Sequence, residues 1–237
     1  MDQESVEEMR QQFVEDRQKR ARAIIPTPWP QLTELAAITY RYKAGFVAER
    51  GSREAKIGRD IAVHAAEAGI PTVLFTGYPP ARVPETLLID TKPNPTPDDI
   101  NARGRTLIRG RMPELLVVER FERIGTSHPE QPVLEADSEE EREDLSWGDR
   151  LMWAVRDVHL DYPSIYTTVA NKVDPTRPLL KSVESTDHPG MVMTDVCRPV
   201  LMVRRSGPTT VDVRFEVDAL EYRVGPYTVE WEPLQIR

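Results

Sequence analysis

The chain has 237 residues and a net charge of −8, with 39% hydrophobic and 30% charged residues. This length suffices for one large α/β domain with a substantial core, and the composition is typical of a folded protein rather than a disordered one. The acidic balance argues against nucleic-acid binding through bulk charge, and the single cysteine, Cys197, excludes an internal disulfide. No apolar run approaches the roughly 20 residues that cross a bilayer, and the N-terminus lacks an apolar signal segment. We therefore expect a cytoplasmic protein without membrane contact.

The first segment, residues 2 to about 23, is charged and free of Gly and Pro, which favours a helix. Val6, Met9 and Phe13 recur at spacings of three and four and form one narrow apolar stripe. Such a helix is marginal alone and needs a surface to pack on, either its own domain or a neighbouring subunit. We expect residues 1–23 to form a docking helix and residues 24–237 to form the folded domain.

The next part of the chain predicts a βαβ unit between residues 44 and 79. Phe46 and Val47 belong to a first strand, a charged turn follows, and the apolar face of a helix over about 57–68 ends near Gly69. The continuous apolar run 73–75 is typical of a central parallel strand that is covered on both faces.

The remaining elements continue the alternation of helices and strands. Two alternating apolar and polar stretches close the sequence and indicate antiparallel strands. The pattern predicts one α/β domain with a mostly parallel sheet and an antiparallel edge. The predicted elements are helices at 31–36, 81–89, from 97 and 147–159, strands at 114–119, 164–170 and 198–205, an acidic loop at 126–146 and a polar segment at 171–190.

Six stretches together resemble the C-terminal RecA-like ATPase domain of DnaB-type replicative helicases, from about Ala21 to Arg237. They are IPTPWPQLTEL, IGRDIAVHAA, TVLFT, PELLVVERFERI, YPSIYTTVANK and YRVGPYTVEW, in the order that the family has them. The resemblance implies a RecA-like three-layer α/β sandwich with antiparallel C-terminal strands.

The resemblance also places a phosphate-binding loop between the first strand and its helix. Such a loop needs two glycines, a lysine and a Ser or Thr, because backbone N–H groups, a cation and a hydroxyl hold the phosphates and Mg²⁺. Only the intermediate Gly51 remains here, and Glu54 sets a negative charge where the lysine would neutralise one. The four fixed positions of the motif are matched by Ala48, Arg53, Glu54 and Ala55.

The family's other functional positions are also altered. Tyr78 matches the glutamate that polarises water, Glu119 matches the Walker B aspartate, and Val169 matches the sensor glutamine. Arg223 matches the arginine finger, but Glu221 replaces its lysine companion. Phosphoryl transfer depends on positioning and charge neutralisation, so we expect no catalytic residues, no bound cofactor and no metal. ATP and Mg²⁺ would be expected only if the loop works in another register.

Metal and triad chemistry find little support in the sequence. The four histidines and the cysteine show no metal-ligand spacing, and Ser185, Asp187 and His188 lie in a polar loop without a nucleophile elbow. The histidines and the cysteine considered as metal ligands are His64, His128, His159, His188 and Cys197.

Three hypotheses about function remain. The first is a catalytically inactive RecA-like homologue that acts through protein–protein interaction, with the N-terminal helix and Arg223 as candidate interface elements. The second is a divergent DNA-dependent ATPase or helicase with an unconventional phosphate loop. The third is a non-catalytic module that binds single-stranded nucleic acid weakly through a basic face. That face would comprise Lys172, Arg177, Lys181, Arg204 and Arg205.

Overall fold

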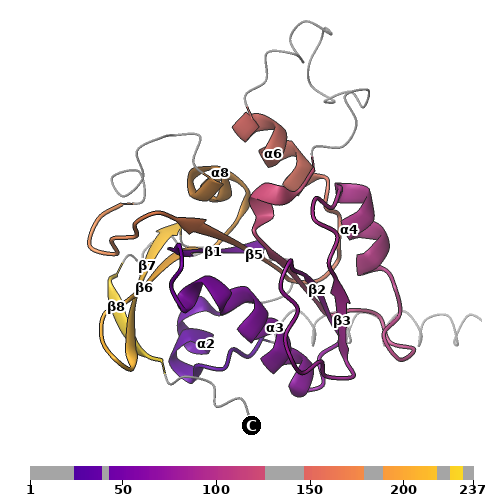
Figure 1. The fold of residues 1–237 in the computed structure, drawn as a ribbon, viewed down its shortest axis with the longest axis horizontal. Coiled ribbons are helices and arrows are strands. Elements are labelled where there is room, and N and C mark those ends of the chain that lie inside the picture. Colours follow the sequence, from indigo (N-terminus) through magenta and orange to yellow (C-terminus); the bar gives the residue numbers. More distant parts are fainter. Residues whose placement is uncertain (1–23, 39–42, 126–146, 179–188, 218–224, 232–237) are drawn as a thin grey trace, which may run out of the picture.

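The computed structural model describes residues 24–38, 43–125, 147–178, 189–217 and 225–231 (Figure 1). The predicted N-terminal helix with Val6, Met9 and Phe13, the acidic loop 126–146, Lys181 and Arg223 lie outside the described residues. The expected division into a docking helix and a domain therefore remains a prediction.

One eight-stranded sheet forms the centre of the molecule, in the order β3-β2-β4-β5-β1-β6-β7-β8. The six strands from β3 to β6 run parallel, and β7 and β8 add an antiparallel edge. The predicted α/β class with a mostly parallel sheet is confirmed. The strands are β1 Lys43–Glu49, β2 Thr72–Phe75, β3 Leu87–Asp90, β4 Leu115–Glu119, β5 Ser164–Ala170, β6 Val200–Arg205, β7 Thr210–Val217 and β8 Tyr227–Glu230.

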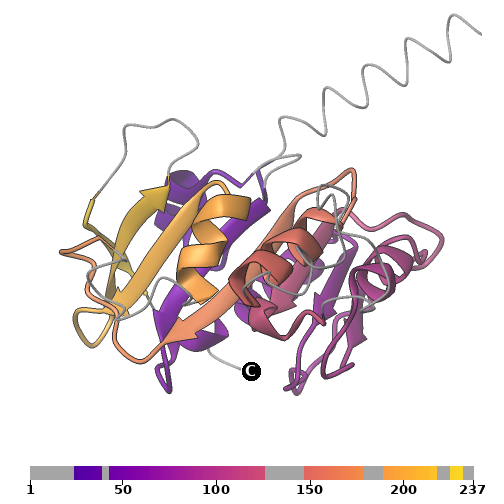
Figure 2. The ribbon, with the colours of Figure 1, turned by 90° about the horizontal axis from the view of Figure 1, so that it is seen from above.

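Helices cover both faces of this sheet, which gives the three layers of the sandwich (Figures 1 and 2). Apolar side chains of α2 and α3 pack with one face of the sheet, and those of α4, α6 and α8 pack with the other. Burial on both faces explains why the central strands read as continuous apolar runs. The α-helices of the described residues are α2 Pro30–Ala36, α3 Ile57–Glu67, α4 Pro97–Gly104, α6 Trp147–Arg156 and α8 Pro189–Val196.

Two glycines allow helices to approach the sheet closely. A Cβ on Gly45 of β1 would lie 2.3 Å from the sulfur of Met193, so the missing side chain admits α8. A Cβ on Gly58 would lie 2.6 Å from the Thr167 methyl group, so the first turn of α3 packs directly on β5. The second contact fixes where α3 begins relative to the strand ends.

The structure departs from the sequence-based prediction in three places. Residues 87–90, expected in a helix over 81–89, form strand β3, because they pair in parallel with β2 at the edge of the sheet. Helix α8 begins at the last two residues of the predicted polar segment and continues through residues for which the sequence predicted no element. Val192 and Met193 are buried against the sheet, and this tertiary packing was not visible in local composition. The helix predicted for 147–159 ends earlier, at Arg156.

Candidate functional site at the carboxyl edge of the sheet

The loop between β1 and α3 lies at the edge where the parallel strands end. In open α/β sheets this edge is the usual place for ligands. The loop runs through residues 50–56, contains the 3₁₀ turn η1 (Glu54–Lys56) and leads into α3. It is the same connection in which the sequence places Gly51, Arg53, Glu54 and Ala55.

Glu54 is the buried charge of this loop, with only 1% of its surface exposed. Its Oε1 accepts hydrogen bonds from Nε of Arg205 at 3.0 Å and from Nη2 at 2.8 Å. Arg205 ends β6, the strand beside β1, and its Nη1 also donates to the Pro208 carbonyl at 2.7 Å. A buried carboxylate is tolerated only when it is paired, so Arg205 balances the charge of the loop from within the chain.

The second oxygen of this carboxylate, Oε2, is buried and has no hydrogen-bond partner among the described residues. Arg205 therefore engages one side of Glu54 only. The side chain of Arg205 remains one-third exposed, with 33% of its surface open to solvent.

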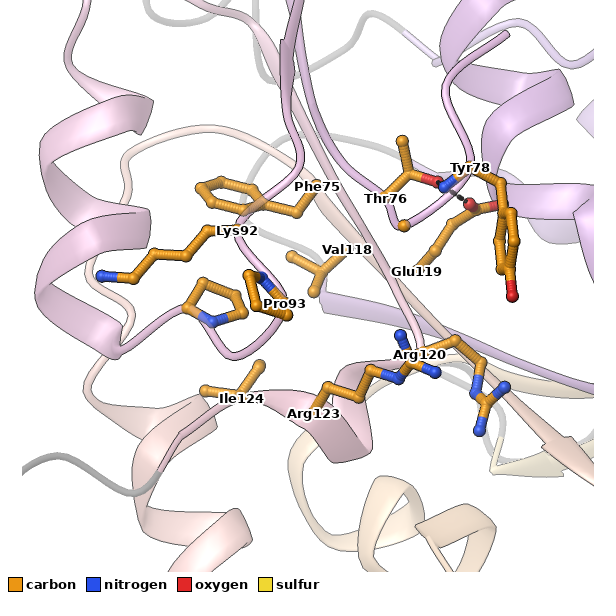
Figure 3. A pocket seen from close by; sticks show the side chains of 12 residues that line it. Phe75, Thr76, Tyr78, Lys92, Pro93, Val118, Glu119, Arg120, Arg123 and Ile124 are labelled. Carbon is orange, nitrogen blue, oxygen red and sulfur yellow. Dashed lines mark hydrogen bonds between the residues drawn. The ribbon is translucent and has the colours of Figure 1, made fainter.

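Glu119 is the second carboxylate at this edge, and it caps α3. It ends β4, and its Oε1 accepts a hydrogen bond from the backbone N–H of Arg59, the third residue of α3, at 3.3 Å. Its Oε2 accepts one from the hydroxyl of Thr76 (Figure 3). The first N–H groups of a helix need acceptors and carry partial positive charge, which suits a carboxylate. Burial raises the pKa of Glu119, while these hydrogen bonds and the Arg59 charge oppose the rise.

Asp60, the next residue of α3, is also perturbed. Burial raises its pKa from 3.8 to about 6; Arg59 opposes the rise, and the nearby charge of Glu119 adds to it. Two partly buried carboxyl groups thus share the start of one helix, and this arrangement keeps Asp60 mostly neutral below about pH 6.

The structure brings most of the candidate positions to the same edge. Ala48 on β1 pairs with Val169 on β5, and both are buried. Gly51 adopts a φ of 76° in the exposed turn, a conformation that suits glycine. Arg53 is exposed, Ala55 is half-buried, and neither is paired with Glu54.

Tyr78 lies on the loop after β2 and is 71% exposed. Its carbonyl accepts a hydrogen bond from Nη1 of Arg59 at 2.6 Å, and its N–H donates to the Thr76 hydroxyl at 3.0 Å. Tyr78 and Glu119 therefore belong to one network through Thr76 and Arg59. Sequence reasoning missed Thr76 and Arg59, although the position of Thr76 directly after a buried strand was a usable indication.

In the described part of the chain, no three His, Cys, Asp or Glu side chains gather in a way that would hold a metal ion. No helix in that part of the chain is long and apolar enough to cross a membrane.

The sheet order, the layers and the position of the β1–α3 loop define a RecA-like α/β fold. No protein-family model matches the sequence, and no curated protein matches it. Solved structures do match. The ATPase domain of a DnaB-type helicase superposes with a TM-score of 0.58 at 13% identity, over 96% of this chain and 95% of that domain.

Two further solved structures share the fold. A DnaB-like replicative helicase, described together with its interactions with primase, gives a TM-score of 0.58 at 12% identity, over 86% of this chain and 58% of that one. A KaiC-like protein from the hyperthermophilic archaeon Pyrococcus horikoshii gives 0.54 at 13% identity, over 87% and 93%. At these identities the likeness establishes the fold, and the predicted resemblance to the DnaB-type ATPase domain is confirmed at that level.

Proposed function

We propose that this protein does not hydrolyse ATP and instead acts through protein–protein interaction, as an assembly subunit, an adaptor or a regulator of an active partner. The observation that carries the proposal is the buried Glu54, held by Arg205 inside the loop between β1 and α3. A nucleotide at this loop would bring its phosphates next to a carboxylate. An unpaired carboxylate repels a phosphate charge by about 4 kcal/mol at 4 Å and an effective dielectric of 20, and Arg205 offsets part of this repulsion. The same ion pair already engages the guanidinium of Arg205, which is therefore not free to neutralise a phosphate.

The second carboxylate supports the same conclusion. Helix N-termini bind phosphate through free N–H groups. At α3, the side chain of Glu119 already accepts the N–H of Arg59. Glu54 thus engages the Arg205 cation and Glu119 engages the N–H group of Arg59, and a phosphate would need groups of both kinds. Phosphoryl transfer relies on positioning and charge neutralisation, so this arrangement favours a role without hydrolysis.

The proposed role requires a protein partner in place of a nucleotide. The helicase in the comparison is described with its interactions with primase. We infer that the present chain keeps the fold as a platform for contacts of that general kind.

The test is a phosphate-release assay on the full-length protein with Mg-ATP, with and without a single-stranded DNA oligonucleotide. We expect the wild type and Glu119→Gln to release the same background amount of phosphate. Phosphate release by the wild type that Glu119→Gln abolishes would establish the divergent ATPase and overturn the proposal. An assay of Arg82→Gln, an exposed residue of the loop between β2 and β3, controls for unspecific effects of substitution.

A further inference from the structure

A small pocket opens beside the candidate site, outside the ends of β2 and β4 (Figure 3). Its wall is apolar where it meets the core, because Phe75, Val118 and Ile124 belong to the buried cluster on that face of the sheet. Pro93 and Pro95 of the loop after β3 complete that wall. The cavity volume is about 30 Å³. About two water molecules would fill this volume, so a single side-chain group fits and a nucleotide does not.

The rim of this pocket carries positive charge. Lys92 turns its amino group to Asp99 at 2.5 Å, and Arg120 forms an ion pair with Glu122. Arg123 is exposed and forms no ion pair with any residue that the structure describes. Its Nη1 lies 3.4 Å from the place that a Cβ on Gly77 would occupy, so the guanidinium lies against the backbone at the pocket mouth. Among the described residues of this rim, Arg123 is thus the cation that forms no ion pair and is available to a ligand.

The backbone supports this placement of the arginines. Arg120 adopts φ 58° and ψ 57°, a left-handed conformation that non-glycine residues rarely take. It turns the chain from the end of β4 into the short 3₁₀ turn η2 (Phe121–Arg123), which brings Arg120 and Arg123 to the same rim. Glu119, the acidic residue of the lining, is held by Thr76 and by the start of α3.

We propose that this pocket binds an acidic side chain, flanked by an apolar residue, of a partner protein; this inference rests on the proposed function and adds the chemistry of the partner. A carboxylate matches the planar fork of Arg123, which can donate two parallel hydrogen bonds. The flanking apolar residue packs on Tyr78 and Pro93, which are the exposed ring side chains of the lining. A nucleic-acid phosphate would satisfy the arginine but would make no apolar contact with these two side chains.

A random heptapeptide library displayed on phage tests the inference, with immobilised full-length protein as the target. We expect peptides selected by the wild type to share an Asp or Glu beside an apolar residue. Selection on Arg123→Gln should lose that acidic preference. Selection on Arg82→Gln, which removes the same charge from an exposed loop outside the pocket, should keep it.

The selected peptide and its twin with Gln in place of the acid give the quantitative readout by fluorescence anisotropy. We expect the twin to bind the wild type about tenfold more weakly or worse, as for loss of a charged hydrogen bond, and both peptides to bind Arg123→Gln equally weakly. Three outcomes would overturn the inference. The two peptides could bind the wild type equally, Arg82→Gln could lose as much affinity for the acidic peptide as Arg123→Gln, or a single-stranded oligonucleotide could displace the peptide. If the peptide experiments fail and the protein does not hydrolyse ATP, only the assignment of the pocket is refuted. If the protein hydrolyses ATP, the proposed function is refuted.

Discussion

The ion pair between Glu54 and Arg205 has two unequal partners, because one is buried and the other is one-third exposed. Removing Arg205 leaves a buried carboxylate unpaired, whereas removing Glu54 leaves a guanidinium that water can reach. We therefore expect Arg205→Ala to lower the free energy of unfolding by about 3 to 5 kcal/mol, and Glu54→Ala by about 1 to 2 kcal/mol. Urea denaturation measures both values.

The double variant decides whether the pair acts as a unit. With both charges gone, the loss should be no greater than that of Arg205→Ala alone, since the unpaired carboxylate has been removed. Arg53→Ala, an exposed neighbour, should change stability by no more than about 0.5 kcal/mol. A larger loss in Glu54→Ala than in Arg205→Ala would contradict this account.

Asp60 makes a prediction about pH. Its pKa is raised from 3.8 to about 6 in the folded state, so the folded protein binds the proton more tightly than the unfolded chain. Its favourable contribution is full below pH 3.8 and is lost as the pH rises to about 6. Asp60→Asn should therefore be more stable than the wild type at pH 7.5, by up to about 3 kcal/mol. The difference should vanish near pH 4; urea denaturation at both pH values checks this, and a constant difference would refute it.

At the scale of elements, most of the sheet could be predicted from the sequence. The apolar runs of β1, β2, β4, β5 and β6 have the length and composition of buried parallel strands, and the structure places strands there. Strand β3 was not predicted because its edge residues are mostly half-buried and lack the continuous apolar pattern of a central strand. Its pairing with β2 determines its conformation.

The candidate site was harder to predict than the sheet. The sequence locates the loop and the carboxylate at position 54, but no local pattern indicates that Arg205 will balance it. The two residues lie 151 positions apart, and only the adjacency of β1 and β6 joins them. The link from Glu119 to Arg59 and Thr76 depends in the same way on the packing of α3 over the strand ends.

Two tryptophans connect distant elements on the α2 face of the sheet. Trp29, just before α2, stacks on Trp231, just after β8, with ring centroids 3.4 Å apart and an angle of 16° between the planes. Both are buried in the same apolar cluster. Trp231→Ala should lower the free energy of unfolding by about 3 to 5 kcal/mol, because it opens a cavity there.

Thermal unfolding and near-ultraviolet circular dichroism measure this effect, since loss of the stack changes the aromatic signal. Tyr78→Ala, which truncates a side chain that is 71% exposed, is the matched control and should leave stability within about 0.5 kcal/mol. A Trp231→Ala variant as stable as this control would show that the stack is dispensable.

At the scale of the whole molecule, the proposal predicts how nucleotide affects assembly. Light scattering after size-exclusion chromatography should give the same molar mass with and without Mg-ATP, because the loop between β1 and α3 carries its own charge balance. Assembly that appears only with Mg-ATP would contradict the proposal and favour the divergent ATPase. If the protein assembles without nucleotide, Phe13→Asp tests the predicted docking helix, and an unchanged mass would exclude that helix as the interface.

The 151-residue separation within the ion pair has a consequence for biosynthesis. The loop after β1 emerges early from the ribosome, but the arginine that neutralises it is made only after most of the chain. Until then, the Glu54 carboxylate must stay hydrated. The segment from β1 through α3 to β2 therefore cannot reach its final packing before β6 has been made. Long-range closure of this kind slows folding and prolongs exposure of apolar strands. A chain truncated before β6 should accordingly remain dependent on chaperones or aggregate, even though it contains five of the six parallel strands.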